Sequence, residues 1–214
     1  MQNIKTDRRY YELQRAEIAR LIVGSPKNIL EIGCASGFFK RNITWECDYH
    51  GIEPMHEAAN CARESGITVY EGTYKDVEEA IPDKHFDLIV CNDVIEHMAD
   101  PWGFLRSIKK KLGPNGYVMG SLPNVRYLLN LKDLLFRRDW HYVSGGVLDY
   151  THLRFFTLKS ARRLFGECGY VVEELKPSGP DRFRLLKKVL TPFFWPLGVD
   201  TLYMQMAFRM RVSE

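Results

Sequence analysis

Residues 28–37 read NILEIGCASG, and this stretch decides the fold. The apolar residues within 29–32 form a short run that predicts a buried strand of a parallel sheet. Gly33 follows the strand and Gly37 comes four residues later, and glycine permits a tight turn in which no Cβ blocks a ligand. Residues 38–43 then predict a helix, whose amide groups and positive end would face the same pocket. Such a pocket suits an adenosine-containing cofactor at the carboxyl end of a strand.

The spacing of the glycines distinguishes between cofactors. A dinucleotide fingerprint requires G-x-G-x-x-G, and Ala35 stands where the middle glycine would be. The pattern E-x-G-x-[AG]-x-G resembles the first motif of class I S-adenosylmethionine-dependent methyltransferases. The resemblance implies that four residues of this stretch bind that cofactor, namely Glu31, Gly33, Cys34 and Gly37. A strand followed by an ordinary turn, with no ligand, is the alternative interpretation.

A second predicted strand, residues 48–53, ends in an acid. Glu53 lies 20 residues after Gly33, and a carboxylate at this spacing can accept hydrogen bonds from both ribose hydroxyls. Pro54 suits the first position of the helix that follows, and we place it with Glu53 in the cofactor site. Gly66 is predicted to end that helix. A surface glutamate after a strand is the alternative interpretation.

Two further segments are candidates for the cofactor site through the resemblance. A helix predicted over residues 8–23 would cover the cofactor and bring Tyr11 and Arg15 to it, although a packing helix with a solvated arginine fits equally well. The loop after a predicted strand at residues 67–71 would edge the adenine ring. Its candidates are Tyr74 and Asp76, the latter with the alternative of capping a helix that starts at Val77.

The stretch FDLIVCNDVIEHMADP, residues 86–101, resembles the fourth-strand region of class I methyltransferases that act on small molecules. The resemblance implies that Asn92 and Asp93 face the methionine part of the cofactor and the incoming nucleophile. His97 follows, and a histidine titrates near neutral pH, so it can act as a general base. A structural histidine is the alternative. A helix at 101–112, a turn at 113–116 and a strand at 117–122 continue the pattern.

Residues 125–156 interrupt the alternation of strands and helices. Aromatic residues, paired glycines and polar groups in this insertion predict a lid over a pocket. Its end, LDYTHLRFFT, resembles a segment of small methyltransferases associated with bacterial surface-polysaccharide synthesis, and more loosely one of quinone O-methyltransferases. Asp149, His152 and Arg154 are therefore candidates on the substrate side, with Asp149 and His152 joining His97 as catalytic candidates. A hydrogen-bonded connector is the alternative.

The last third of the chain completes an α/β fold. A helix is predicted from Thr157 to Gly169, followed by strands at residues 170–175 and 201–208. We expect one domain over residues 1–214, with a Rossmann-like, seven-stranded, mainly parallel sheet, helices on both faces and an antiparallel last strand. Between the two strands, residues 182–196 are basic and apolar. They are a candidate for contact with a membrane or a lipid-linked substrate, and packing on their own domain is the alternative.

The composition limits the partners. The chain has 214 residues and a net charge of +3, too small to indicate nucleic acid by itself. It has no apolar run long enough for a membrane span, and the polar first residues predict no signal peptide. Five cysteines without a C-x-x-C pair indicate reduced residues of a cytoplasmic protein. The oligomeric state is left open.

The predicted reaction is methyl transfer from S-adenosylmethionine to a hydroxyl of a small molecule, which the resemblance suggests is a sugar or polysaccharide precursor. The alternatives are a quinone-type acceptor, a metal-assisted RNA-terminal methyltransferase, and a binding module without catalysis. A nicotinamide oxidoreductase is disfavoured by the missing glycine. Asp93, Glu96 and His97 form only part of the RNA-terminal ligand set, because Asp93 replaces a glutamate. We therefore expect no metal ion.

Overall fold

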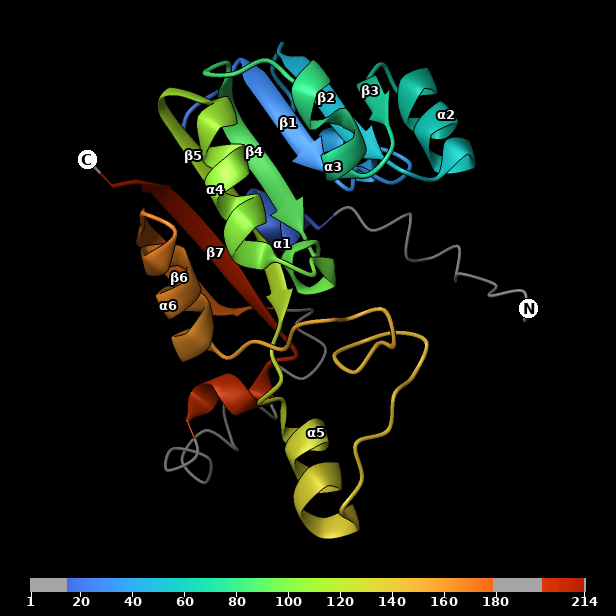
Figure 1. Ribbon diagram of the computed structural model, residues 1–214, viewed down its shortest axis with the longest axis vertical. Coiled ribbons are helices and arrows are strands. Elements are labelled where there is room, and N and C mark those ends of the chain that lie inside the picture. The colour runs from blue at the N-terminus through green and yellow to red at the C-terminus, as the bar shows by residue number, and fades with distance from the viewer. Residues whose placement is uncertain (1–14, 179–197, 214) are drawn as a thin grey trace.

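A computed structural model describes residues 15–178 and 198–213. Within them, seven strands form one sheet in the order β3-β2-β1-β4-β5-β7-β6, with helices on both faces (Figure 1). The strands are β1 (Asn28–Ile32), β2 (Asp48–Glu53), β3 (Thr68–Glu71), β4 (Phe86–Asn92), β5 (Leu112–Pro123), β6 (Tyr170–Ser178) and β7 (Gln205–Val212). The α-helices are α1 (Ala16–Ala19), α2 (His56–Glu64), α3 (Tyr74–Val77), α4 (Pro101–Lys111), α5 (Leu128–Lys132) and α6 (Leu158–Glu167). Short single-turn helices are η1 (Phe38–Asn42), η2 (Glu78–Ala80), η3 (Ile95–His97), η4 (Asp133–Arg137) and η6 (Val199–Leu202).

Both faces of the sheet are buried, because side chains alternate between them along each strand. In β4, Leu88 and Val90 pack on the side of α1 and η1, whereas Ile89 and Cys91 pack on the side of α4 and α6. All four side chains are fully buried. The apolar runs of the sequence therefore fill two cores, as the prediction of a parallel α/β sheet requires.

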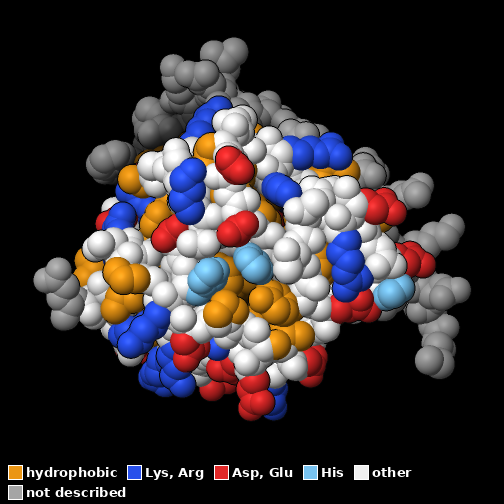
Figure 2. Space-filling view, turned by 90° about the horizontal axis from the view of Figure 1, so that it is seen from above, with side chains coloured by type: hydrophobic (Ala, Val, Ile, Leu, Met, Phe, Trp, Pro, Cys, Tyr) orange, Lys and Arg blue, Asp and Glu red, His pale blue; other side chains and the backbone are white. Residues whose placement is uncertain are grey.

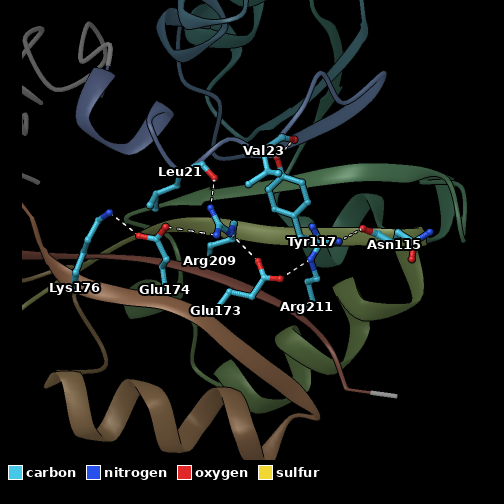
Figure 3. A network of polar contacts seen from close by, with 9 residues as sticks. All are labelled: Leu21, Val23, Asn115, Tyr117, Glu173, Glu174, Lys176, Arg209 and Arg211. Atoms are coloured by element: carbon cyan, nitrogen blue, oxygen red, sulfur yellow. Dashed lines mark hydrogen bonds and ion pairs between the residues drawn. The ribbon is translucent and has the colours of Figure 1, made fainter.

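Strand β7 is antiparallel to both of its neighbours, β5 and β6, and the other pairings are parallel. This confirms the predicted antiparallel last strand. Ion pairs hold β7 in place: Arg209 and Arg211 both contact Glu173 of β6, and Arg209 donates to the carbonyl of Leu21 at 2.9 Å (Figure 3). The prediction of a strand over residues 201–208 is wrong at its beginning. The helical turn η6 occupies residues 199–202, and β7 begins at Gln205.

Three local predictions differ from the structure. Residues 38–43 form the 3-10 helix η1 instead of an α-helix. Pro54 is not the first residue of a helix, because α2 begins at His56 with Met55 as its N-cap. The predicted turn at 113–116 is a bulge inside β5, since Leu112 pairs with Phe86 and the regular register resumes only at Tyr117.

The insertion at residues 125–156 carries α5 and η4, which lie apart from the sheet in Figure 1. The sequence predicts a broad apolar face for this helix. Leu128 and Leu131 are half-buried, but Leu135 and Phe136 are exposed, to 67% and 81%. The helix therefore presents apolar surface instead of burying it. Both ends of the insertion are tied down, because Val125 donates to the Phe156 carbonyl at 2.9 Å and Leu153 donates to that of Glu96 at 2.9 Å.

Surface charge and helix length are relevant to two kinds of partner considered above, nucleic acid and membranes. On the face shown in Figure 2, lysine and arginine side chains are interspersed with aspartate and glutamate. In the described part of the chain, every helix is too short or too polar to cross a bilayer. The segment at residues 182–196, the candidate for membrane contact, lies outside the described residues.

Candidate functional site

The glycine turn after β1 has the backbone that the sequence predicts. Gly33 and Gly37 have φ values of 70° and 77°, which a residue with a Cβ adopts at a cost. A Cβ on Gly37 would also lie 2.7 Å from Cδ1 of Ile67. The amides of Gly33 and Cys34 donate to the Ile52 carbonyl at 2.9 and 3.0 Å. The turn thus offers close approach to the backbone, while these two amides serve to anchor it to β2 and are not free for a ligand.

Glu53, at the end of β2, joins the glycine turn to the next loop. Its carboxylate accepts hydrogen bonds from the amides of Ala35 and Met55, both at 2.9 Å. The side chain is only 5% exposed, and burial raises its pKa, opposed by these two amides. Each amide uses one acceptor position, so the carboxylate oxygens keep further lone pairs for ribose hydroxyls.

Glu31 and Cys34 lie beneath the turn, in the core. Glu31 is 3% exposed, and it accepts a hydrogen bond from the Tyr49 hydroxyl at 2.8 Å. Burial raises the pKa of Glu31 to about 8. Cys34 is 3% exposed and packs closely on Gly51, where a Cβ would lie 2.5 Å from its sulfur. These contacts support the turn from below, and a direct contact with the cofactor remains a prediction for both residues.

The carboxyl end of β4 carries a second set of polar groups. Asp93 has a φ of 52° and is 7% exposed. Its carboxylate pairs with Arg15, and it accepts from Ser121 Oγ at 2.8 Å and from Gln205 Nε2 at 3.0 Å. Neighbouring Asn92 contrasts with it, because both polar atoms of its amide are buried without a hydrogen-bond partner in residues 15–178 and 198–213. Asn92 is thus ready to receive a polar ligand, whereas Asp93 and Arg15 already bind each other.

Several predicted residues lie elsewhere. Tyr74 is 7% exposed and belongs to the core, where its ring packs against Phe104 at 5.1 Å between centroids. Asp76 is exposed and accepts from the backbone amide of Thr73 at 2.9 Å, as part of the capping box of α3. Pro54 is exposed in the loop before α2. Tyr11 lies outside the described residues.

The structure brings His97 and His152 together, with ring centroids 4.8 Å apart. Glu96 joins them. It is completely buried, its two carboxylate oxygens lack a hydrogen-bond partner in the described part of the chain, and burial raises its pKa to about 8. His152 Nε2 lies 3.9 Å from Glu96 Oε1. We call these three residues the Glu96 cluster. Glu96 is not among the catalytic residues predicted from the sequence, where it appeared only in an incomplete metal-ligand set, although its place beside His97 after a strand was the available signal.

The other substrate-side candidates make local contacts. Asp149 accepts from the amide and the hydroxyl of Thr151, at 2.8 and 2.6 Å. Arg154 donates to the Ala99 carbonyl at 2.5 Å. These bonds shape the end of the insertion around the Glu96 cluster, and a role of either side chain with a substrate remains a prediction.

Three features together define the class I methyltransferase architecture. They are a sheet in which β7 runs antiparallel, a glycine turn after β1 and an acid at the end of β2. The comparisons with known proteins agree. The profile of a family described as "Methyltransferase domain" matches residues 6–175, so the chain belongs to this family. The two solved structures below are described as S-adenosylmethionine-dependent, and the family match supports the same cofactor for this chain.

Two solved structures show the same fold. A methyltransferase of Thermotoga maritima, described as a possible histamine N-methyltransferase, superposes with a TM-score of 0.63 at 17% identity, over 96% of this chain and 90% of that one. An S-adenosylmethionine-dependent methyltransferase of Mesorhizobium loti also superposes with a TM-score of 0.63. The identity is 16%, over 94% of this chain and 97% of that one.

Among curated relatives, a ubiquinone biosynthesis O-methyltransferase of Paraburkholderia phymatum is 33% identical over 116 residues, which are 51% of this chain and 48% of the relative. Its counterpart in Pectobacterium atrosepticum is 31% identical over 106 residues, which are 46% of this chain and 43% of that relative. The matched region thus spans about half the length of these relatives.

The residues present fit S-adenosylmethionine. The turn after β1 has positive φ values at Gly33 and Gly37, which glycine adopts readily, and the buried amide of Asn92 has no partner among the described residues. Glu53 would hold the ribose, and Asn92 the methionine part. Bound there, the cofactor supplies an electrophilic methyl group on a sulfonium. The protein contributes orientation and a place for the proton that the acceptor loses.

Proposed function

We propose that the protein transfers the methyl group to a hydroxyl of a small molecule bound beside the Glu96 cluster. The observation that carries this proposal is the unpartnered carboxylate of Glu96, completely buried among two imidazoles. A buried acceptor without a donor is costly, and a substrate hydroxyl is a donor that would satisfy it. The cluster follows β4 directly, at the edge of the sheet where the glycine turn lies.

Within the small molecules, we favour a phenolic hydroxyl of a quinone-type compound. The curated relatives named above are ubiquinone biosynthesis O-methyltransferases, and the exposed apolar side chains of α5 and η4, such as Leu135 and Phe136, suit an apolar acceptor. A sugar hydroxyl is the second candidate. It rests on the likeness of LDYTHLRFFT to enzymes of surface-polysaccharide synthesis and on the polar side chains of that segment.

We also propose that residues 125–156 close over the acceptor as a lid. One end of the insertion is anchored at the Glu96 cluster, because Leu153 and Arg154 donate to the Glu96 carbonyl. A Cβ at Gly145 or Gly146 would meet no atom within 4 Å, so these two glycines leave the backbone room to hinge.

The test of this function is an acceptor screen with S-adenosylmethionine labelled on its methyl group. We expect label in the ether of an ortho-diphenol that carries a short isoprenoid chain, and little in nucleotide sugars. His152→Ala should cut this turnover while leaving the affinity for S-adenosylhomocysteine nearly unchanged. The matched control, His56→Ala, changes an exposed histidine on α2 and should keep full activity. Label appearing only in amines, or in sugars but no phenol, would refute the proposed acceptor.

A further inference from the structure

The Glu96 cluster is built unlike an ordinary hydrogen-bonded network. The ligand-capable atoms of its three side chains all lie within 4.8 Å of one another. Glu96 has no exposed surface, and among the described residues no hydrogen bond reaches either carboxylate oxygen. A buried carboxylate of this kind is costly unless a charge or a set of donors compensates it. Nε2 of His152 lies 3.9 Å from Oε1, which is too far for a hydrogen bond.

The two histidines present the correct atoms to a ligand. The Nδ1 atom of His97 lies 3.1 Å from the Thr151 carbonyl, and that of His152 lies 3.0 Å from the Val147 carbonyl. A carbonyl only accepts, so each Nδ1 carries the hydrogen and donates it. Each Nε2 then keeps its lone pair. A histidine whose other ring nitrogen donates to a backbone carbonyl is the usual arrangement at metal sites, where that bond fixes the tautomer and the ring.

We propose that Glu96, His97 and His152 hold a divalent transition-metal ion beside the acceptor. Two imidazoles and one carboxylate suit Zn²⁺, Mn²⁺, Fe²⁺ or Co²⁺ better than Mg²⁺, which prefers oxygen ligands. In a tetrahedral site with bonds of about 2.1 Å, two ligand atoms stand roughly 3.4 Å apart. The ligand atoms of the cluster lie within 4.8 Å of one another, so each needs to move inward by less than about 1 Å.

This proposal revises the expectation of a metal-free site. That expectation rested on Asp93, which stands where the compared ligand set has a glutamate. In the structure Asp93 is engaged by Arg15, Ser121 and Gln205 and is no part of the cluster. Its identity is therefore no argument against an ion at the Glu96 cluster.

The catalytic role of the ion rests on the proposed function. The ion would lower the pKa of an acceptor hydroxyl that binds beside it. The hydroxyl proton leaves to water, a lone pair of the oxygen forms the new O–C bond, and the C–S bond breaks with its electrons passing to sulfur. The products are a methyl ether, S-adenosylhomocysteine and the released proton.

The test measures ion binding without any acceptor. Protein freed of metal by a chelator is titrated with Co²⁺, followed by visible absorption and calorimetry, and then with Mn²⁺ and Zn²⁺. We expect one ion per chain, and a loss of affinity of tenfold or more in both Glu96→Gln and His152→Ala. His56→Ala is the matched control for adventitious binding and should bind as the unchanged protein does. S-adenosylhomocysteine binding and circular dichroism verify that each variant is folded, and His97→Ala replaces any variant that is not.

Failure to bind any of the three ions, or equal affinity in the cluster variants and the unchanged protein, would overturn the metal site. An ion bound at the cluster by a protein that methylates no hydroxyl would support the site and refute the proposed function. The two ideas therefore fail separately.

Discussion

Replacing Glu53 by alanine tests whether its carboxylate holds the cofactor. The change removes two hydrogen bonds from the amides of Ala35 and Met55, each at 2.9 Å. At about 1 kcal/mol each, their loss lowers the free energy of unfolding by about 2 kcal/mol. The loss of hydrogen bonds from ribose to a buried carboxylate adds about 1–3 kcal/mol to the free energy of cofactor binding. The dissociation constant should therefore rise roughly 5- to 150-fold.

Isothermal calorimetry with S-adenosylhomocysteine measures this change, and thermal unfolding without ligand measures the structural part. Glu71→Ala is the matched control. Glu71 pairs in register with Glu53 on neighbouring β3, but its carboxylate binds Arg63 and His56 at the surface. We expect cofactor affinity to be unchanged in this control. Wild-type affinity in Glu53→Ala would refute the assignment, whatever the loss of stability.

Two further predictions concern stability and the lid. Burial raises the pKa of Glu31 from 4.5 to about 8, so the folded state binds its proton more tightly than the unfolded state, and this stabilisation is lost as pH rises from 4.5 to about 8. The Glu31→Gln side chain stays neutral, so this variant should be more stable than the unchanged protein at pH 8, by an amount on the order of a few kcal/mol. Urea unfolding at several pH values measures the difference. Profiles of unfolding free energy against pH that run parallel for the two proteins would contradict the prediction. Hydrogen exchange across residues 137–150 should slow only when cofactor and acceptor are both bound, whereas equal protection in the free and bound protein would show a static connector.

The sheet was predictable because its strands are short apolar runs with turn residues at their ends. The prediction for β2 agrees with the structure at both ends, residues 48 and 53, since an acid and a proline mark where the strand stops. The start of β7 was not predictable in the same way. Residues 201–204 are as apolar as a strand, yet Asn124, directly after β5, donates to the carbonyls of Asp200 and Tyr203, at 2.9 and 3.1 Å, and this contact supports a helical turn there.

The candidate site was predictable only where local geometry decides it. The glycine turn and Glu53 follow from spacing, because a turn and a strand end are set by nearby residues. Tyr74 was misleading because its burial depends on α4, where Ser107 binds its hydroxyl at 2.7 Å. Glu96 was considered only as part of an incomplete metal-ligand set, because its contact with His152 exists only once the insertion is folded.

The position of β7 has a consequence for the order in which the protein can be assembled. This strand follows β6 in the chain, yet it lies between β5 and β6 in the sheet. While synthesis has not reached residue 205, β5 keeps an open edge and β6 has no neighbour to pair with. An open strand edge is a template for pairing with other chains, and nascent chains are exposed to this hazard until the missing strand arrives. Ribosome-bound chains that stop just before Gln205 should therefore associate with chaperones more than chains that extend past Val212.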